Sequence, residues 1–428
     1  MILTSSSFYR VWPRPHDPMH VLDPCEDEMT RFKTVRRALV AAIALGSMLS
    51  VAACGNGEAG SASGTDSGSA DDPLRVGLLF SLTGPAAPYG ISERNGARVV
   101  LDQINEDGGI NGQQIEIFEA DDKTDPTEAA QQARKLITQD KVDVIIGTTA
   151  GGNTLAYAPI AAGLKTPILA TNGTISVTDK ANDFWPWIFR SAPSDLVTMQ
   201  AMFDQVVAEG KTRIGIFAEQ SAYGDASVAY LEEQVEKAGL EIVAETSAAV
   251  TDTDFTAQAT KLRNADPDVV LLVTGATALG VGIARAVRQG GSDVDMWGGI
   301  GLAQQGFIDG AGPDAEGVHM VAMNNWNDPS EDEQQLKDLL EAAGFEATSF
   351  EAAGANGAQV VAAGAEKVEG EITGEKLRDA MATVCDLNTY AIGESVCYTE
   401  DERDGMGTDA LALLVVEDGA FATYDPNA

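Results

Sequence analysis

Basic residues, histidines and long apolar runs are all scarce in this chain of 428 residues, and each scarcity narrows the possible functions. There are 28 basic against 65 acidic residues, which gives a formal net charge of −37. Binding to phosphates needs clustered Lys and Arg, so this balance argues against a general nucleic-acid surface. Downstream of residue 54, no apolar run reaches the about 20 residues that a membrane-spanning helix needs. The acidic residues predict a solvated surface, which suits secretion into salty surroundings.

Signatures of enzymes are also missing. The sequence contains no GxSxG, HExxH or GxxxxGK[ST] motif. His319 lies in a predicted apolar strand, residues 318–321, and is interpreted as a structural histidine. Asp121 and Asp122 could form a metal site or a pair of catalytic carboxylates, but a solvated strand end is the favoured interpretation. We therefore expect a protein that is not an enzyme, with no catalytic residues, no cofactor and no metal.

Only four cysteines are present, and two of them, Cys25 and Cys54, fall near the N-terminus. Cys385 and Cys397 are the remaining pair. In a protein that is expected to be exported, this pair predicts a disulfide. In the chain-entropy model, closing a loop of that size adds roughly 3 kcal/mol to the free energy of unfolding. A metal site is not expected there, because neither cysteine has a nearby histidine or a CxxC partner.

The N-terminal region is typical of an export signal. Residues 1–28 show no periodicity and are interpreted as an over-long start, with Met29 as the expected true start. A basic segment, residues 31–37, precedes an apolar segment, residues 38–53, that is too short to span a membrane. Residues 51–54 resemble a bacterial lipobox, which predicts that Cys54 is lipidated; ordinary signal cleavage is the alternative. Residues 1–53 would then be removed, and the Gly- and Ser-rich residues 54–73 are expected to act as a flexible tether.

The stretch from 143 to 154 predicts a binding loop. Residues 144–146 form an apolar run that stops at Gly147, and a helical pattern follows from residue 155. In parallel sheets, ligands bind beyond the carboxyl ends of the strands, where helix N-termini present N–H groups to anions. Gly151 and Gly152 would allow a ligand to approach the backbone closely. A turn without a ligand is the alternative interpretation.

Strands and helices alternate along the rest of the chain. Strands are predicted at 74–80, 114–118, 167–170, 213–218, 241–244, 269–274, 295–297, 410–416 and 421–424. Helices are predicted at 224–238, 255–264, 277–288, 331–343, 350–367 and 374–383. This alternation predicts an α/β protein with two doubly wound parallel-sheet lobes and a cleft between them.

A family resemblance supports this architecture. Residues 79–85, residues 104–112 and the Asp121-Asp122 pair resemble the opening of the leucine/isoleucine/valine-type binding proteins. These proteins have the type I periplasmic-binding fold and serve ABC transporters of branched-chain amino acids. The resemblance extends over residues 74–424 and implies two lobes that close on a ligand by hinge motion. It places 74–192 with 323–395 in lobe 1, and 193–322 with 396–428 in lobe 2.

The resemblance also implies a set of ligand contacts. They are Ser81, Tyr89, Ala150, Gly151, Gly152, Thr171, Asn172, Gly173, Thr174 and Tyr223. Gly151 stands where the family usually has a serine. No acid is present at Ile300, where amino-acid-binding members place a glutamate for the ligand's ammonium group, and Glu219 and Asp225 are the candidates to replace it.

These implications lead to a functional hypothesis. The protein is expected to be a lipoprotein outside the cell membrane that captures a branched-chain or related amino acid for ABC permease subunits. A small organic acid or amide is the alternative ligand, and a sensory ligand-binding module is the alternative role. Residues 183–187, which contain Trp185 and Trp187, are predicted to pack in the core rather than to form a stacking platform. Trp326 and Phe350 are the predicted apolar lid over the ligand.

Overall fold

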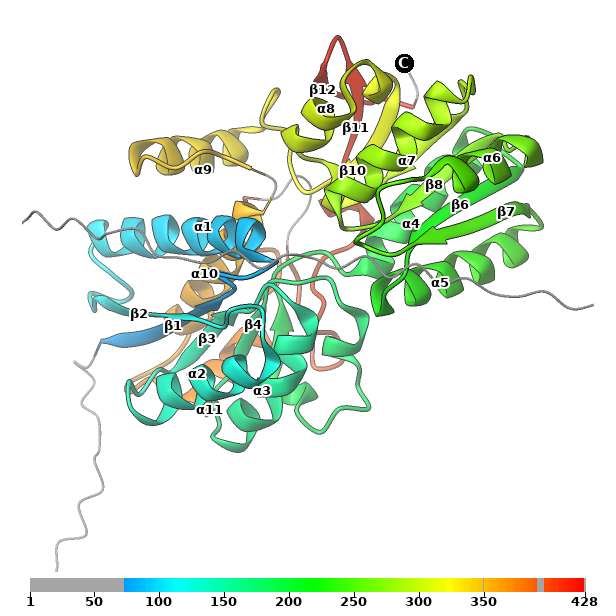
Figure 1. The fold of residues 1–428 in the computed structure, drawn as a ribbon. Coiled ribbons are helices and arrows are strands. Elements are labelled where there is room, and N and C mark those ends of the chain that lie inside the picture. Colours follow the sequence, from blue (N-terminus) through cyan, green and yellow to red (C-terminus); the bar gives the residue numbers. More distant parts are fainter. Residues whose placement is uncertain (1–72, 349, 391–395, 427–428) are drawn as a thin grey trace, which may run out of the picture. The chain divides into compact units, whose positions relative to one another are not determined.

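The computed structural model describes residues 73–348, 350–390 and 396–426 (Figure 1). The export signal, most of the tether and Cys54 lie outside the described residues. Two parallel-stranded sheets organise the chain, which confirms the predicted α/β class with two doubly wound lobes. No helix in the described part of the chain has both the length and the apolar character needed to cross a membrane.

The first sheet is entirely parallel, in the order β2-β1-β3-β4-β5. Its strands are β1 (Leu74–Phe80), β2 (Ile115–Asp121), β3 (Val144–Gly147), β4 (Ile168–Ala170) and β5 (Ile188–Arg190). Side chains alternate across the sheet, so that Val76 and Leu78 enter one core while Leu79 enters another on the opposite face. The strands are buried on both faces, as expected of a parallel sheet.

Helices cover both faces of this sheet (Figure 1). One core joins the sheet to α1 (Ala87–Glu106), α9 (Glu331–Ala342), α10 (Glu351–Glu366) and α11 (Gly374–Met381). The other joins it to α2 (Pro126–Thr138) and α3 (Gly151–Gly163). Helices α9, α10 and α11 come from much later in the chain, so this lobe is built from discontinuous segments.

The second sheet has the order β12-β11-β10-β9-β8-β6-β7. Its parallel strands are β6 (Arg213–Glu219), β7 (Glu241–Ala248), β8 (Val269–Val273), β9 (Asp295–Gly298) and β10 (Val318–Ala322). The closing strands β11 (Ala412–Glu417) and β12 (Ala420–Thr423) pair antiparallel, so the prediction of a parallel sheet does not extend to this edge. On one face of the sheet lie α4 (Asp195–Ala208) and α5 (Ala222–Ala238), and on the other α6 (Thr256–Ala265), α7 (Thr277–Gln289) and α8 (Gln305–Ala311).

Helix α4 was not predicted, although its sequence carries a helical signal. Met199, Met202, Phe203 and Val206 follow the i, i+3, i+4, i+7 spacing of an amphipathic helix, and all four are buried. Thr198 and Ala201 beside this stripe are buried as well, so the buried face of the helix is wide. The short elements β5 and α8 were also missed, as were the 3₁₀ turns at Ile175–Thr178, Trp185–Trp187, Ile300–Leu302, Gly312–Ala315 and Thr408–Ala410.

The segment after α11 differs from the predicted lobe boundary. Cys385 and Cys397 are joined by a disulfide. Beyond it, Val396, Tyr398 and Met406 are buried in the core of the first sheet, not of the second. Residues 396–410 therefore pack with the first lobe, and the chain reaches the second sheet only at β11. We call residues 396–410 the C-terminal strap.

Candidate functional site

A cavity of about 500 Å³ lies among loops of both sheets. Its walls are formed by residues that directly follow the carboxyl ends of β3, β4, β5, β6, β8, β9 and β10, together with the start of α1. The volume is within the range of small-molecule sites. The position agrees with the general rule that ligands of parallel α/β sheets bind beyond the carboxyl ends of the strands.

Eight of the ten predicted contacts line this cavity. They are Tyr89, Ala150, Gly151, Thr171, Asn172, Gly173, Thr174 and Tyr223. Ser81 does not, because its buried hydroxyl donates to Asp122 Oδ1 at 2.7 Å. Gly152 is exposed on α3 and does not line the cavity.

Asp122 organises the loops beneath the cavity. It is fully buried, which corrects the expectation of a solvated strand end for this residue. Its carboxylate accepts hydrogen bonds from the hydroxyls of Ser81 and Thr148 and from the N–H of Thr124. The loops that follow β1, β2 and β3 are thus fixed to one buried acid, and the predicted contact Ser81 has a supporting role. Neighbouring Asp121 instead accepts from Leu82 and Thr83 at a more exposed position.

The N-terminus of α3 opens into the cavity at Ala150 and Gly151. Ala150 is the N-cap and has no side-chain oxygen, so no side chain caps the helix. The first N–H groups of the helix have no intrahelical acceptor and carry partial positive charge. A Cβ atom at Gly151 would lie 2.1 Å from Thr174 Oγ1, so only glycine allows this approach. The hydroxyl of Thr174 therefore lies close to the position, Gly151, at which the resembling proteins usually have a serine.

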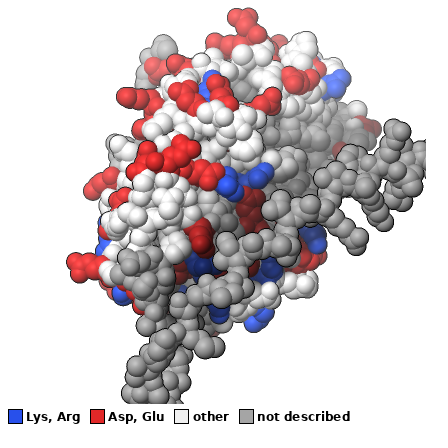
Figure 2. Space-filling view, turned by 90° about the vertical axis from the view of Figure 1, so that its left-hand side faces the viewer, with Lys and Arg blue, Asp and Glu red and all other residues white. Residues whose placement is uncertain are grey.

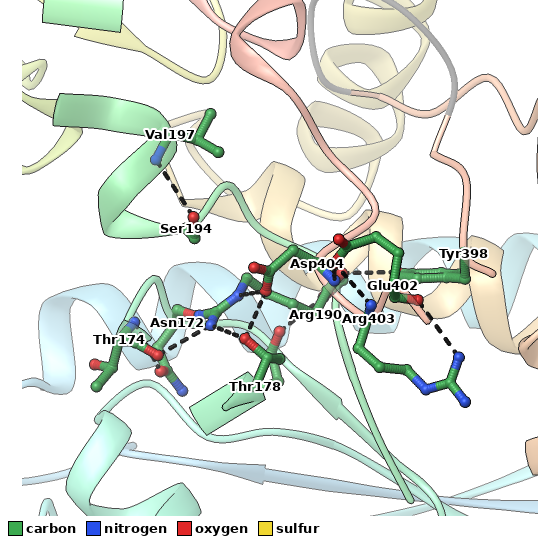
Figure 3. A network of polar contacts seen from close by, with 12 residues as sticks. Asn172, Thr174, Thr178, Arg190, Ser194, Val197, Tyr398, Glu402, Arg403 and Asp404 are labelled. Atoms are coloured by element: carbon green, nitrogen blue, oxygen red, sulfur yellow. Dashed lines mark hydrogen bonds and ion pairs between the residues drawn. The ribbon is translucent and has the colours of Figure 1, made fainter. Parts of the chain in front are cut away.

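Arg190, whose side chain is fully buried, holds the loop from Asn172 to Thr174 in place (Figure 3). The guanidinium donates to the carbonyl oxygens of Asn172 and Thr174, the latter at 2.9 Å, and to Thr178 Oγ1 at 2.7 Å. Its charge is balanced by Asp404, with Nε and Oδ1 2.6 Å apart. A planar fork of donors can bind several acceptors in fixed directions, which explains an arginine here.

The C-terminal strap supplies the other half of this network (Figure 3). The carbonyl oxygen of Arg403 accepts a hydrogen bond from the backbone N–H of Arg190 at 2.8 Å, and the hydroxyl of Tyr398 donates to the carbonyl oxygen of Arg190 at 2.6 Å. The strap is therefore joined to β5 by one backbone hydrogen bond and one side-chain hydrogen bond. The sequence did not predict the contact between Arg190 and the strap, because these two partners are more than 200 residues apart.

Aromatic side chains form one wall of the cavity. The rings of Tyr89 and Phe350 lie edge to face, with centroids 4.9 Å apart. The hydroxyl of Tyr89 donates to the carbonyl of Gly275, 3.2 Å away on the loop that follows β8. Of the two residues predicted as a lid, Phe350 lines the cavity, whereas Trp326 does not and donates instead to the carbonyl of Thr348.

The prediction that the tryptophans of residues 183–187 pack in the core is wrong. Trp185 and Trp187 are only partly buried, and neither lines the cavity. Arg403 lies over the Trp185 ring at 4.7 Å and Arg378 over the Trp187 ring at 4.3 Å. Cation–π contacts cover these rings at the surface. Phe184 alone enters the core as expected.

Three acidic residues line the cavity, Glu93, Asp195 and Glu219, and the lining contains no Lys, Arg or His. Burial raises the pKa of Glu93 to about 8, although a hydrogen bond from Thr149 opposes this shift. Burial likewise raises the pKa of Asp195 to about 6, against the effect of nearby Arg190. At neutral pH, Glu93 is thus mostly protonated while Asp195 is mostly ionised.

Sequence reasoning found only Glu219 among these acids. Asp225, its other candidate, is exposed on α5 and does not line the cavity. Asp195 lies directly after β5 at the start of α4, and a recognised β5–α4 unit would have placed it at the cavity. Glu93 follows Tyr89 by one helical turn on α1, a spacing that puts both side chains on one face.

Outside the cavity, His319 lies against aromatic rings. It stacks on Trp297 with centroids 4.6 Å apart, and burial lowers its pKa. It does not line the cavity. Over the described ranges, no cluster of three or more His, Cys, Asp or Glu side chains is arranged to hold a metal ion.

Comparisons with known proteins agree with this geometry. The family described as periplasmic binding protein matches residues 73–420. The Leu/Ile/Val-binding protein BraC3 of Rhizobium johnstonii is 27% identical, over 82% of this chain and 94% of that protein. The leucine-, isoleucine-, valine-, threonine- and alanine-binding protein of Pseudomonas aeruginosa is also 27% identical, over 73% of this chain and 83% of that protein.

Solved structures show the same fold. An extracellular ligand-binding receptor from Rhodopseudomonas palustris is 26% identical with a TM-score of 0.69, and the match covers 82% of this chain and 99% of that one. LivJ of Streptococcus pneumoniae, a branched-chain amino acid transporter substrate-binding protein in complex with isoleucine, is 23% identical with a TM-score of 0.71 and coverage of 82% and 98%. Because the family match extends over most of the chain, this protein belongs to the periplasmic binding protein family.

Proposed function

We propose that this protein is an extracytoplasmic solute-binding protein that captures a branched-chain or related amino acid and delivers it to the permease of an ABC importer. The observation that carries the proposal is the cavity itself. It combines helix N–H donors at Gly151, an acidic lining without Lys, Arg or His that favours a cationic group, and an apolar wall at Tyr89 and Phe350. A carboxylate, an ammonium group and an aliphatic side chain each find a matching surface there.

The relatives support this ligand class. BraC3 and the Pseudomonas aeruginosa protein are both named for binding leucine, isoleucine and valine. Solute binding requires closure of two lobes around the ligand, and the hydrogen bond from Tyr89 to Gly275 joins α1 to the loop after β8 at the cavity. The function is one of binding and release, with no chemical step.

Membrane attachment is part of the proposal. The basic segment, the apolar segment and residues 51–54 together favour a lipid on Cys54, with residues 54–73 as the tether. Several acyl chains would hold the protein stably at the outer face of the cell membrane, near its permease.

Calorimetric titration of the purified protein tests the ligand class. Leucine, isoleucine and valine should bind with dissociation constants of about 1 μM or tighter. Their deaminated keto-acid analogues should bind far more weakly. Tight binding of the keto acids without the amino acids would replace the proposed ligand by a small organic acid.

A further inference from the structure

The acids of the cavity differ in how fully they are already engaged. Glu219 is occupied within the protein: its Oε1 accepts from Ser221 Oγ at 2.6 Å, and its Oε2 accepts from Thr274 Oγ1 at 2.9 Å and from Gly275 N at 3.0 Å. These bonds tie the loops after β6 and β8 together. Glu219 therefore acts chiefly as a support for the cavity wall.

Glu93 is also unsuited to binding a cation. It is 1% exposed and accepts a hydrogen bond from Thr149 Oγ1 at 2.6 Å. Buried acids that have no cationic partner favour the neutral form, which attracts a cation only weakly. The buried acids Asp122 and Glu351 nearby favour that neutral form further.

Asp195 differs from both. Its backbone is fixed at the cavity, because its N–H donates to the carbonyl of Gly173 at 2.7 Å and Ser194 caps the helix that it begins. Its Oδ1 lies beside Gly173, where a Cβ atom would be only 2.3 Å away. Yet among the described residues no hydrogen-bond donor is found for its carboxylate. Its side chain is only partly buried and lines the cavity, and Arg190 acts on it through charge without a hydrogen bond. The carboxylate is therefore open to a donor from a ligand in the cavity.

The position of Asp195 would also let it replace the acid that is missing at Ile300. A side chain at Gly299, next to Ile300, would contact Thr198 and lie 3.8 Å from the hydroxyl of Tyr223. Thr198 is one helical turn after Asp195 and lines the same cavity. The loop that carries the acid in amino-acid-binding relatives therefore meets the first turn of α4. An acid on α4 can serve the same region of the ligand.

From these contacts we propose that Asp195 binds a protonated amino group of the ligand, while the N-terminus of α3 faces the opposite end of the ligand. The inference rests on the proposed function in that it takes the cavity to be the ligand site. It is broader in one respect, because it requires an amine but not a particular side chain. Ligands without a cationic group are then selected against by the acidic lining.

Calorimetry with three probes tests this assignment: leucine, its decarboxylated amine 3-methylbutan-1-amine, and its keto acid 4-methyl-2-oxopentanoate. Asp195→Asn should weaken leucine binding by about 10- to 100-fold, the range for a hydrogen bond to a charged group. Binding of the keto acid should be unchanged or tighter in this variant. Asp225→Asn, which removes the same charge from the first turn of α5 outside the cavity, should stay within about twofold of the wild type for leucine.

The outcomes separate the two proposals. If leucine, isoleucine and valine fail to bind but the amine binds in an Asp195-dependent way, the amino-acid function is wrong and the role of Asp195 stands. If leucine binds equally well to the wild type and Asp195→Asn, the function stands and the role of Asp195 is wrong. Failure of every amine to bind the wild type, or preference of the wild type for the keto acid, would also overturn the role of Asp195. Thermal unfolding of each variant would verify that it is folded.

Discussion

Glu93 shows how a single buried side chain can couple the binding site to pH. It is on α1, between the aromatic wall and the loop after β3, and is 1% exposed. Burial raises its pKa from 4.5 to about 8, and the neighbouring acids Asp122 and Glu351 add to the shift. The native state therefore binds a proton that the unfolded state releases above pH 4.5. The stability contributed by this proton is complete below pH 4.5 and is lost as the pH rises through 8.

Glu93→Gln should remove this pH dependence while keeping an acceptor for Thr149. As the pH rises from 5 to 9, the wild type should lose a few kcal/mol of unfolding free energy that the variant keeps. The size follows from about 1.4 kcal/mol for each unit by which the pKa of Glu93 is raised. Urea unfolding at several pH values would measure the difference. Glu116→Gln, at a half-exposed position, is the control and should follow the wild type. Parallel profiles for Glu93→Gln and the wild type would show that Glu93 is ionised in the native state.

The elements of the fold differ in how far sequence could predict them. β1, β3 and β8 are continuous apolar runs bounded by polar or turn residues, and their burial on both faces makes them predictable. α4 has the apolar spacing of a helix at Met199, Met202, Phe203 and Val206, so it could have been predicted. The sequence did not place Asp195 at the cavity, because which loops meet there depends on the whole fold. The strap was assigned to the wrong lobe because its partner Arg190 is distant in sequence.

The network between β5 and the strap leads to a prediction about this element. Asp404→Asn keeps the shape of the side chain but leaves the buried Arg190 without a full counter-charge. We expect a loss of about 1–3 kcal/mol in the free energy of unfolding. Ligand binding should weaken as well, because Arg190 also holds the carbonyls of Asn172 and Thr174 at the cavity. Denaturant unfolding and calorimetry of the same samples would measure both effects.

A matched control lies three residues earlier in the strap. Asp401 has a side chain that is 93% exposed and pairs with Lys180 at 4.0 Å. An exposed pair of this kind contributes little, so Asp401→Asn should change stability by less than about 0.5 kcal/mol. Equal effects of the two substitutions would mean that the strap responds to charge in general and not to its contact with Arg190.

At the scale of the whole molecule, the surface charge bears on the proposed membrane anchor. Acidic side chains are spread over the face shown in Figure 2 rather than gathered into one patch. With a net charge of −37, self-repulsion is long-ranged at low salt and is screened within about 8 Å at physiological ionic strength. Such a surface favours solubility and discourages association with anionic lipids, so it offers the membrane no attraction of its own.

The proposed attachment to the membrane would come from the N-terminus, and the Cys54→Ala variant tests this. Expressed in a bacterium with its export signal intact, the wild type should be found in the membrane fraction, with a mature N-terminus at Cys54 and a mass that includes acyl chains. The variant cannot be acylated there, so it should be released into the soluble fraction or accumulate unprocessed. Cys25→Ala removes a cysteine upstream of the predicted signal and should fractionate as the wild type does. If Cys54→Ala remains in the membrane fraction with normal processing, the lipid anchor is refuted, and the acidic body must be held there by a protein partner instead.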